Sequence, residues 1–333
     1  MKKIIVFGGG GYCGSVLVPQ LISEGWKVTV YDKFWYGKAH LPLTSPNLLC
    51  IEGDVRDIGG VEDVLTNQSY VLHLACISND ASFELDENLS TSVNLDSFEP
   101  IVLAAKKKGV RRFVFASSSS VYGVSDSPDV TEDHPLVPLT LYNKYKGMCE
   151  PLLLKHTSDS FEGVIFRPET VCGYGPRLRI DFSVNILTNH AINKKKMTVF
   201  GGQQLRPNLH IQDYADLCKI LLDAPIDKVR NQVFNCGFQN MKIIDIALIV
   251  KKIVQREFPD LGEIPIETTT SNDNRSYHIN SDKIKNILGF QPKYSIEDAV
   301  ISLCKAFKEG RIPNSFDSDA YYNVRTMKAI NAK

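Results

Sequence analysis

The sequence predicts an α/β protein in which helices cover both faces of a parallel sheet. Its first half alternates short, continuously apolar runs with segments whose apolar residues recur at helical spacing. Continuous apolar runs are typical of strands buried on both faces, and parallel strands need helical crossovers between them. The predicted strands are KIIVFG (3–8), KVTVYD (27–32), LLCIEGD (48–54), YVLHLAC (70–76) and RRFVFASS (111–118).

The second half continues this alternation but contains more Pro, Gly and Asn. Further strands are predicted in GVIFRPETV, KMTVFGG and NQVFNCG, and a long helix in IIDIALIVKKIVQREF. No repeat or low-complexity linker separates the two halves. We therefore expect a dinucleotide-binding domain at residues 1–165. Residues 166–333 should form a smaller, intercalated lobe, some of whose segments return to the first sheet.

Composition excludes several classes of protein. Lys+Arg and Asp+Glu balance at 38 each, which gives no electrostatic case for binding nucleic acid or a membrane surface. The 8 cysteines are scattered with no CxxC pair, and no His/Cys/Asp spacing indicates a metal site. No apolar run has transmembrane length, and no signal peptide precedes the first strand. We expect a cytoplasmic protein with reduced thiols.

A glycine cluster joins the first strand to the first helix. IIVFGGGGYCGS places Gly8, Gly11 and Gly14 in a GxxGxxG pattern, a variant of the Rossmann spacing. Such glycines permit a tight turn, close approach of the backbone to a pyrophosphate, and packing of the helix on the strand. A flexible loop is the alternative interpretation, but the position in the first βα unit favours dinucleotide binding.

Two acidic residues follow the next strands. Asp32 ends the second strand about twenty residues after the glycines, where a carboxylate suits a ribose 2′-hydroxyl. Because that carboxylate would repel a 2′-phosphate, NAD is favoured over NADP, although Lys33 weakens the preference. Asp54 in GDVRD ends the third strand and is either a contact to the adenine edge or an ordinary turn residue.

The stretch LTLYNKYKGMCE contains a tyrosine and a lysine four residues apart. Tyr142 and Lys146 project from one helix face, whereas Tyr145 and Lys144 have no such partner and are predicted to pack or face solvent. A free phenol has a pKa of about 10. A cation at about 4 Å in an effective dielectric of ~20 contributes roughly 4 kcal/mol, about three pKa units. We therefore expect Lys146 to bring the pKa of Tyr142 near 7.

Together these motifs resemble the extended short-chain dehydrogenases/reductases, and more narrowly their NAD-dependent nucleotide-sugar epimerases and dehydratases. The resemblance rests on GxxGxxG, Asp32, GDVRD, HLA (73–75), Asn94, SSSSVYG and YxxxK. It implies a catalytic serine at Ser118, a base at Tyr142 and a lysine that also binds ribose at Lys146. It further implies NAD contacts at Gly8, Gly11, Tyr12, Cys13, Gly14, Asp32, Asp54, Val55, Leu74, Ala75, Asn94 and Lys146.

The same resemblance assigns a nucleotide-sugar site to the second lobe. LRPNLHIQDYAD and NRSYHINSDKIKNILGFQP imply that Arg206 and Arg275 meet the diphosphate, since forked guanidinium groups suit phosphate oxygens. Ser78, Asn79 and Thr170 are expected to line the sugar pocket. RPETVCGYGPR departs from the family pattern at Thr170 and at Glu169, which is either a substrate contact or, slightly favoured, a salt-bridged structural residue.

The resemblance also narrows the reaction. The family's 4,6-dehydratases carry Asp-Glu directly after the catalytic serine or threonine, where this chain has Ser119 and Ser120, and the glutamate of its decarboxylases is absent too. The sequence therefore predicts a nucleotide-sugar 4-epimerase that oxidises the sugar transiently to a 4-keto form. The alternatives are a dehydrogenase or 4-ketoreductase that exchanges its cofactor, and a non-catalytic dinucleotide-binding scaffold. A homodimer through the YxxxK helix and residues 89–108 is implied as well.

Overall fold

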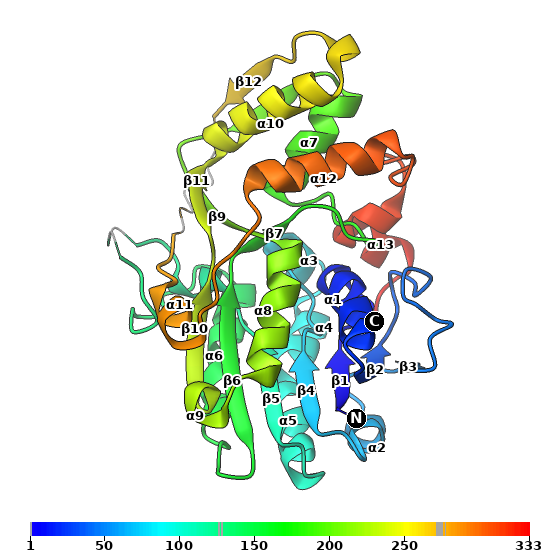
Figure 1. The fold of residues 1–333 in the computed structure, drawn as a ribbon, viewed down its shortest axis with the longest axis vertical. Coiled ribbons are helices and arrows are strands. Elements are labelled where there is room, and N and C mark those ends of the chain that lie inside the picture. Colours follow the sequence, from blue (N-terminus) through cyan, green and yellow to red (C-terminus); the bar gives the residue numbers. More distant parts are fainter. Residues whose placement is uncertain (1, 126, 128, 271–275, 277) are drawn as a thin grey trace.

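A computed structural model of the chain describes residues 2–125, 127, 129–270, 276 and 278–333 (Figure 1). Within these residues, seven strands form one parallel sheet in the order β10-β6-β5-β4-β1-β2-β3. The predicted doubly wound α/β fold is confirmed. The strands of this sheet are β1 (Lys3–Phe7), β2 (Lys27–Asp32), β3 (Leu48–Glu52), β4 (Tyr70–His73), β5 (Arg112–Ala116), β6 (Glu162–Pro168) and β10 (Gln232–Cys236).

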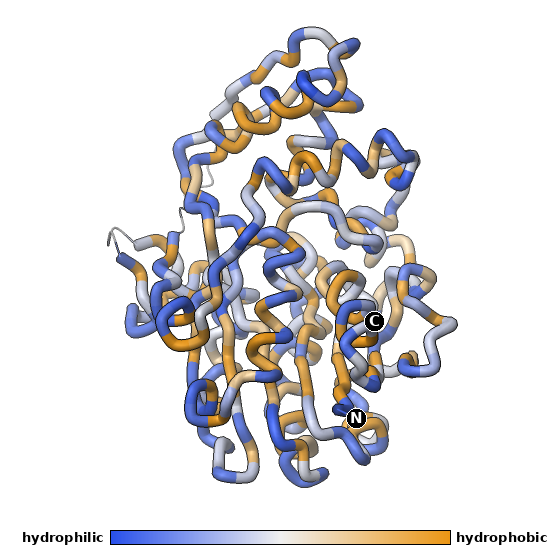
Figure 2. The backbone as a smooth tube through the Cα atoms, viewed as in Figure 1, coloured by the Kyte–Doolittle hydropathy of each residue, from blue (hydrophilic) through white to orange (hydrophobic). Residues whose placement is uncertain are grey.

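Each strand of the sheet contributes to two cores because successive side chains point to opposite faces. In β1, Ile4 and Val6 pack with helices α1 and α8, whereas Ile5 and Phe7 pack on the side of α2, α5 and α6. Figure 2 shows the resulting apolar strands at the centre of the larger lobe. These helices are α1 (Tyr12–Ser23), α2 (Ile58–Leu65), α5 (Phe98–Lys107), α6 (Leu141–Leu154) and α8 (Ile211–Asp223).

Several predicted strands end earlier than their apolar patterns do. β5 ends at Ala116, because Ser118 leaves the sheet and its Oγ accepts the backbone N–H of Ser120 at 3.2 Å. This bond caps the short 3₁₀ helix η2 (Ser119–Tyr122). The carboxyl end of the strand is thus converted into a turn that carries polar side chains.

The smaller lobe has its own core, built mainly from three helices and two small sheets (Figure 1). Strand β10 leaves this lobe and pairs with β6 at the edge of the large sheet, as expected for intercalated segments. The domain boundary proposed at residue 165 falls inside β6. The lobe comprises β7 (Thr170–Cys172), α7 (Ser183–Asn193), β8 (Met197–Phe200), β9 (Leu205–His210), β11 (Gln239–Lys242), α10 (Ile243–Glu257), β12 (Ile266–Thr269) and α12 (Ile296–Lys308).

The C-terminal segment returns to the larger lobe, where Figure 1 places its end near α1 and β2. Met327 is buried in the core on the α2 side, and the carbonyl of Tyr321 accepts the N–H of Ile180 at 3.0 Å. The remaining elements are α3 (Asp80–Phe83), α4 (Glu87–Thr91), η1 (Ser92–Asp96), α9 (Ile226–Val229), η3 (Pro259–Leu261), α11 (Asp282–Leu288), η4 (Asp319–Tyr321) and α13 (Asn323–Ala329).

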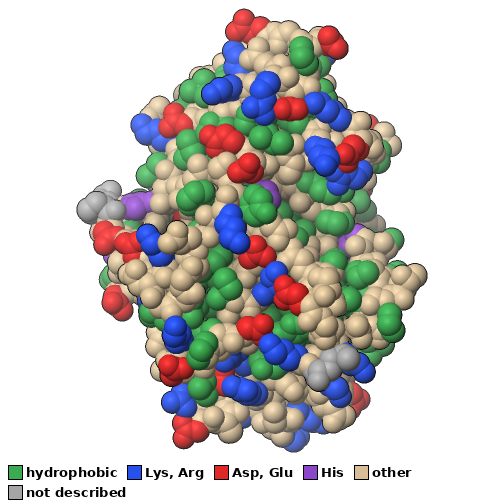
Figure 3. Space-filling model, viewed as in Figure 1, with side chains coloured by type: hydrophobic (Ala, Val, Ile, Leu, Met, Phe, Trp, Pro, Cys, Tyr) green, Lys and Arg blue, Asp and Glu red, His purple; other side chains and the backbone are tan. Residues whose placement is uncertain are grey.

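The surface agrees with the balanced composition. Figure 3 shows Lys/Arg and Asp/Glu side chains interspersed over the visible face, without a large patch of one sign. None of the helices in the described ranges is long and apolar enough to span a bilayer. All eight cysteines are unpaired.

Candidate active site

A cavity of about 500 Å³ opens at the carboxyl ends of the strands and is lined by both lobes. It includes the crevice between β1 and β4, where the strand order reverses and where ligands bind in open α/β sheets. It brings together most of the predicted site residues. These are Gly8, Gly11, Tyr12, Cys13, Gly14, Asp32, Asp54, Val55, Leu74, Ala75, Ser78, Asn79, Ser118, Tyr142, Lys146, Thr170 and Arg206.

The glycine loop has the geometry that a dinucleotide requires. Gly8 has a φ of +79°, and a Cβ there would lie 2.5 Å from the backbone nitrogen of Ala75. At Gly14 a Cβ would lie 2.2 Å from the carbonyl oxygen of Gly9. Within the described chain no side chain caps the N-terminus of α1 at Gly11, so N–H groups of its first turn are available to an anion. The loop therefore fits a bound phosphate.

Asp32 is fixed at the end of β2. Its carboxylate oxygens accept the N–H groups of Gly10 at 2.9 Å and Phe34 at 2.7 Å. Burial raises the pKa of Asp32, and these two hydrogen bonds oppose that shift. The carboxylate thus faces the cavity from a rigid turn next to the phosphate loop.

Asp54 is held by two cations. Lys33 Nζ lies 3.1 Å and Arg56 Nη2 2.6 Å from its Oδ2. Burial alone would raise the pKa of Asp54, but the hydrogen bonds from Arg56 and Lys33 outweigh it and lower the pKa well below its usual range. Because the Lys33 ammonium is paired with Asp54, it offers less attraction to a 2′-phosphate than the sequence alone suggested.

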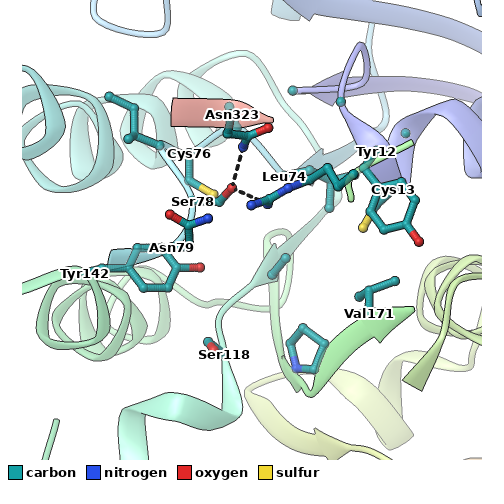
Figure 4. Close-up of a pocket in the computed structure, with 18 of the residues that line it drawn as sticks. Tyr12, Cys13, Leu74, Cys76, Ser78, Asn79, Ser118, Tyr142, Val171 and Asn323 are labelled. Carbon is teal, nitrogen blue, oxygen red and sulfur yellow. Dashed lines mark hydrogen bonds between the residues drawn. The ribbon is translucent and has the colours of Figure 1, made fainter. Parts of the chain in front are cut away.

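The Ser/Tyr/Lys residues face the cavity from two elements, Ser118 from the turn after β5 and the other two from α6. Figure 4 shows Ser118 and the Tyr142 hydroxyl bordering the open space opposite Tyr12 and Cys13. The helix α6 starts at Leu141, since Thr140 Oγ1 accepts the N–H of Asn143 at 3.3 Å as its N-cap. Tyr145 packs edge-on against Phe83 and Lys144 is exposed, which confirms both predictions.

The electrostatics of Tyr142 differ from the sequence-based expectation. Burial, reinforced by Cys76, raises the pKa of Tyr142 well above its usual value, and Arg179 is the cation that opposes this shift. Lys146 donates its Nζ to the carbonyl of Ala116 at 2.8 Å. In the protein alone, Lys146 therefore does not bring the pKa of Tyr142 near 7, because a low-dielectric pocket favours the neutral phenol.

Hydroxyl groups form a chain behind Ser118. Ser118 Oγ lies 2.7 Å from Ser120 Oγ, which donates to Asn143 Oδ1 at 2.5 Å. Asn143 is buried one residue after Tyr142, so the serine turn and the YxxxK helix are tied together. Ser119 and Ser120 both line the cavity, and neither position holds a carboxylate.

Two predicted site residues are not among the lining of the cavity. Asn94 has both side-chain amide atoms bonded to the backbone of Ile77, at 2.8 and 2.9 Å. It therefore positions the segment after β4 that carries Ser78 and does not itself reach the cavity. Arg275 lies outside the described residues.

Several residues of the cavity were missed by the sequence analysis, among them Arg177, Arg179, Asp181 and Asn323. Arg179 binds Asp181 with two hydrogen bonds of 2.9 Å and Ser78 Oγ with one of 2.8 Å. Arg177 donates to Asn323 Oδ1 at 2.6 Å. The alternating arginines of PRLRID were a readable signal for an anion site, whereas nothing in the sequence around Asn323 pointed to the cavity.

Glu169 also lines the cavity, and the salt bridge favoured for it is wrong. It is 4% exposed, its Oε2 accepts the N–H of Phe238 at 2.9 Å, and its Oε1 is buried without a partner in the described structure. Among the residues that the structure describes, none forms an ion pair with Glu169. Burial raises the pKa of Glu169 well above its usual value, because a low-dielectric site favours the neutral form of the carboxyl group.

Comparison with known proteins identifies the family. The model of the NAD-dependent epimerase/dehydratase family matches residues 4–237. The chain belongs to this family. It is 26% identical to a UDP-glucose 4-epimerase of Lactobacillus helveticus, covering 90% of this chain and 95% of the relative. It is 25% identical to a dTDP-glucose 4,6-dehydratase of Actinoplanes sp., covering 93% and 98%.

A solved structure supports the same assignment. MoeE5 in complex with UDP-glucose and NAD is 25% identical and superimposes with a TM-score of 0.79, covering 92% of this chain and 99% of that chain. As a member of the family, the protein is an NAD-dependent enzyme. Its glycine loop and Asp32 fit the cofactor, as the close backbone approaches at Gly8 and Gly14 show. No cluster of metal-ligating side chains is found within the described part of the chain.

Proposed function

We propose that the protein is a nucleotide-sugar 4-epimerase. One observation carries this proposal: Ser118, Tyr142 and Lys146 share a cavity with the dinucleotide loop, and the two positions after Ser118 hold hydroxyls. Relatives that act on UDP- and dTDP-glucose support a nucleotide-sugar substrate. Arg206 lines the same cavity from β9, and we propose that it meets the diphosphate of the substrate.

The proposed mechanism begins with proton transfer from the sugar C4 hydroxyl to the Tyr142 oxygen. Ser118 holds the C4 oxygen by a hydrogen bond, and its own orientation is fixed by Ser120 and Asn143. When bound, NAD would supply a hydride acceptor for C4, the hydride needed to reduce the opposite face of the 4-keto sugar, and a positive ring charge. Tyr142 then gives its proton back to the C4 oxygen, so the reaction consumes nothing.

The raised pKa of Tyr142 adds a requirement to this mechanism. Since burial favours the neutral phenol, Tyr142 must first release its own proton to solvent, and it does so only when further positive charge in the cavity stabilises the phenolate that then accepts the sugar proton. The protein contributes Arg179 and Lys146, and the oxidised cofactor contributes the rest. The enzyme is therefore expected to deprotonate a sugar only in the complete complex.

Elimination of water is disfavoured by the state of the acidic side chains in the cavity. A 4,6-dehydratase needs an acid/base pair after the catalytic serine, and Ser119 and Ser120 cannot provide one. Asp181 is bound to Arg179, and Asp80 accepts the Thr140 hydroxyl at 2.6 Å. Glu169 accepts the N–H of Phe238, and its burial favours the neutral acid. A dehydrogenase or 4-ketoreductase remains the runner-up, because it would use the same three catalytic residues.

We also propose that the protein forms a cytoplasmic homodimer through α5 and α6. Leu103 of α5 is 46% exposed, and Leu141 and Met148 of α6 are 38% and 42% exposed. These two helices pack against each other, so their outward apolar side chains form a face that a second copy would cover. Eight unpaired cysteines fit a reducing compartment.

The function is tested by following UDP-, dTDP-, GDP- and CDP-sugars by nuclear magnetic resonance with the purified protein. An epimerase is expected to invert C4 of one of them without added cofactor and without net absorbance at the wavelength of NADH. A dehydrogenase gives stoichiometric NADH and requires added NAD. Turnover of none of these sugars, or loss of water from one, overturns the proposal.

A further inference from the structure

Arg177 is a buried cation without a carboxylate partner. Its side chain lines the cavity and the residue is only 5% exposed. It donates to the neutral Asn323 Oδ1 at 2.6 Å, and its guanidinium lies 3.8 Å from the ring centroid of Tyr36. Its Nε is buried with no acceptor, and no ion pair to it is found in the described ranges. Arg179, two residues on, differs because Asp181 binds it bidentately.

This arrangement calls for an anion. A buried guanidinium is costly unless a negative group and hydrogen-bond acceptors compensate it. Asp181 and Asp32 attract Arg177 electrostatically but form no salt bridge with it in the described ranges, and the neighbouring Arg179 repels it. Burial and this repulsion lower the pKa of Arg177 to about 10, which still leaves it charged at neutral pH.

The position of Arg177 identifies the anion. Its backbone N–H donates to Ser15 Oγ at 3.2 Å, which fixes the residue over the first turn of α1. This is the turn whose N–H groups face a phosphate. The guanidinium extends toward Tyr36 and interacts electrostatically with Asp32, the residue expected to bind the ribose. The anion that would contact both the first turn of α1 and the guanidinium of Arg177 is the diphosphate of the dinucleotide, on the side of its adenosine.

We propose that Arg177 binds this diphosphate and that the C-terminal helix α13 holds it in place, closing the dinucleotide in. Asn323, the first residue of α13, accepts from Arg177 and donates to Ser78 Oγ at 3.3 Å (Figure 4). Ser78 in turn accepts from Arg179. The tail is also anchored at its end, where Lys33 Nζ donates to the carbonyl of Lys333 at 3.3 Å.

Two consequences follow for the cofactor. The glycine loop binds the diphosphate through its backbone, and Arg177 binds it through a charged side chain. Removing the charge of Arg177 therefore weakens the binding of every ligand that contains the diphosphate. Because Asn323 of α13 binds Arg177 at this contact, undocking of the helix frees Arg177, and removing the Asn323 amide accelerates release of the cofactor. The inference concerns cofactor binding alone and does not depend on which sugar reaction the enzyme performs.

The test is calorimetry on protein stripped of its cofactor. Arg177→Gln is expected to weaken the binding of ADP-ribose and NAD by about 10- to 100-fold, the range for loss of a charge-assisted hydrogen bond. The affinity for adenosine, measured in competition experiments, should not change. The matched control is Arg325→Gln, because Arg325 is an exposed arginine of α13 that donates to the carbonyl of Phe316. It should bind all three ligands like the wild type.

A second variant keeps the proposal testable if Arg177→Gln does not fold. Asn323→Ala keeps the charge, and NAD release after rapid dilution is expected to be several-fold faster than from the wild type or from Arg325→Gln. Unchanged ADP-ribose affinity in Arg177→Gln overturns the diphosphate assignment. So does an equal loss of adenosine, which would mean that Arg177 only supports Tyr36. Unchanged release from Asn323→Ala overturns the role of the C-terminal helix.

Discussion

The two ends of the cavity are built in different ways. At the cofactor end, a short contiguous loop, residues 8–14, presents backbone N–H groups, and Asp32 follows on the neighbouring strand. At the proposed substrate end, Thr170 and Arg206 come from strands β7 and β9 of a lobe assembled from scattered segments, and Glu169 lies in the link between β6 and β7. Backbone geometry tolerates little change, whereas side chains on separate strands can be replaced one at a time. This explains how one cofactor site can serve different sugar reactions.

The largest effect is expected where the two ends meet. Replacing Tyr142 with Phe removes the only proposed proton acceptor and should reduce turnover by about 10²- to 10⁴-fold. NAD affinity should hardly change, because the phenol oxygen is not needed to bind the dinucleotide. Tyr145→Phe is the matched control on the same helix, since Tyr145 packs against Phe83 outside the cavity lining. If Tyr142→Phe turned over sugar at the wild-type rate, the proposed chemistry would be lost.

The second prediction concerns the glycine loop at the cofactor end of the cavity. A Cβ at Gly14 would lie 2.2 Å from the carbonyl of Gly9, whereas at Gly11 the nearest atom is 3.3 Å away. Gly14→Ala should therefore lower the free energy of unfolding by about 1–3 kcal/mol and displace the loop that holds NAD. Gly11→Ala should lower the free energy of unfolding by a smaller amount. Urea denaturation and NAD titration of both variants measure the difference, and equal behaviour of the two would refute this account of the loop.

A third prediction separates the substrate end from the cofactor end. Arg206→Gln should raise the KM for the nucleotide sugar by about 10- to 100-fold through loss of a charge-assisted contact to phosphate. NAD affinity should stay at the wild-type value. Steady-state kinetics and calorimetry together test this. A matching loss of NAD affinity would show that Arg206 serves the cofactor and that the two ends are not independent.

The same contrast explains what the sequence could predict. The glycine loop, Asp32 and the Tyr142–Lys146 pair are local patterns, and all of them lie in the cavity. Arg177 and Asn323 are 146 residues apart, and only the return of the C-terminal segment brings them together. The protonation of Tyr142 was predicted wrongly because a pattern of residues gives the neighbouring charge but not the burial that outweighs it.

Buried carboxyl groups show the same limit. Glu150 and Glu169 are both almost fully buried. Arg167 binds Glu150 with hydrogen bonds of 2.9 and 2.6 Å, and Ser117 donates to it at 2.6 Å. Within the described part of the chain, Glu169 accepts only the N–H of Phe238. The sequence indicated a buried acid at Glu169 but could not say whether a cation reaches it, since that depends on strands from distant parts of the chain.

The smallest expected effect is the pH dependence that Glu169 adds to stability. Burial raises its pKa in the folded protein above the unfolded value of 4.5. Below that value both states are protonated and there is no cost. As pH rises, the unfolded state loses the proton first, so folding becomes progressively less favourable until the folded pKa is reached. Glu169→Gln cannot titrate, and its Tm relative to the wild type should therefore rise between pH 5 and 8.

Thermal melts of the wild type and Glu169→Gln across this range measure the effect, since all other groups titrate equally in both proteins and cancel in the difference. Glu267→Gln is a suitable control, because Glu267 is half exposed and pairs with Lys196 at the surface. A difference in Tm that stays constant from pH 5 to 8 would mean that Glu169 is ionised in the folded state. A cation would then have to lie beside Glu169, and the interpretation of Glu169 as a neutral acid would be wrong.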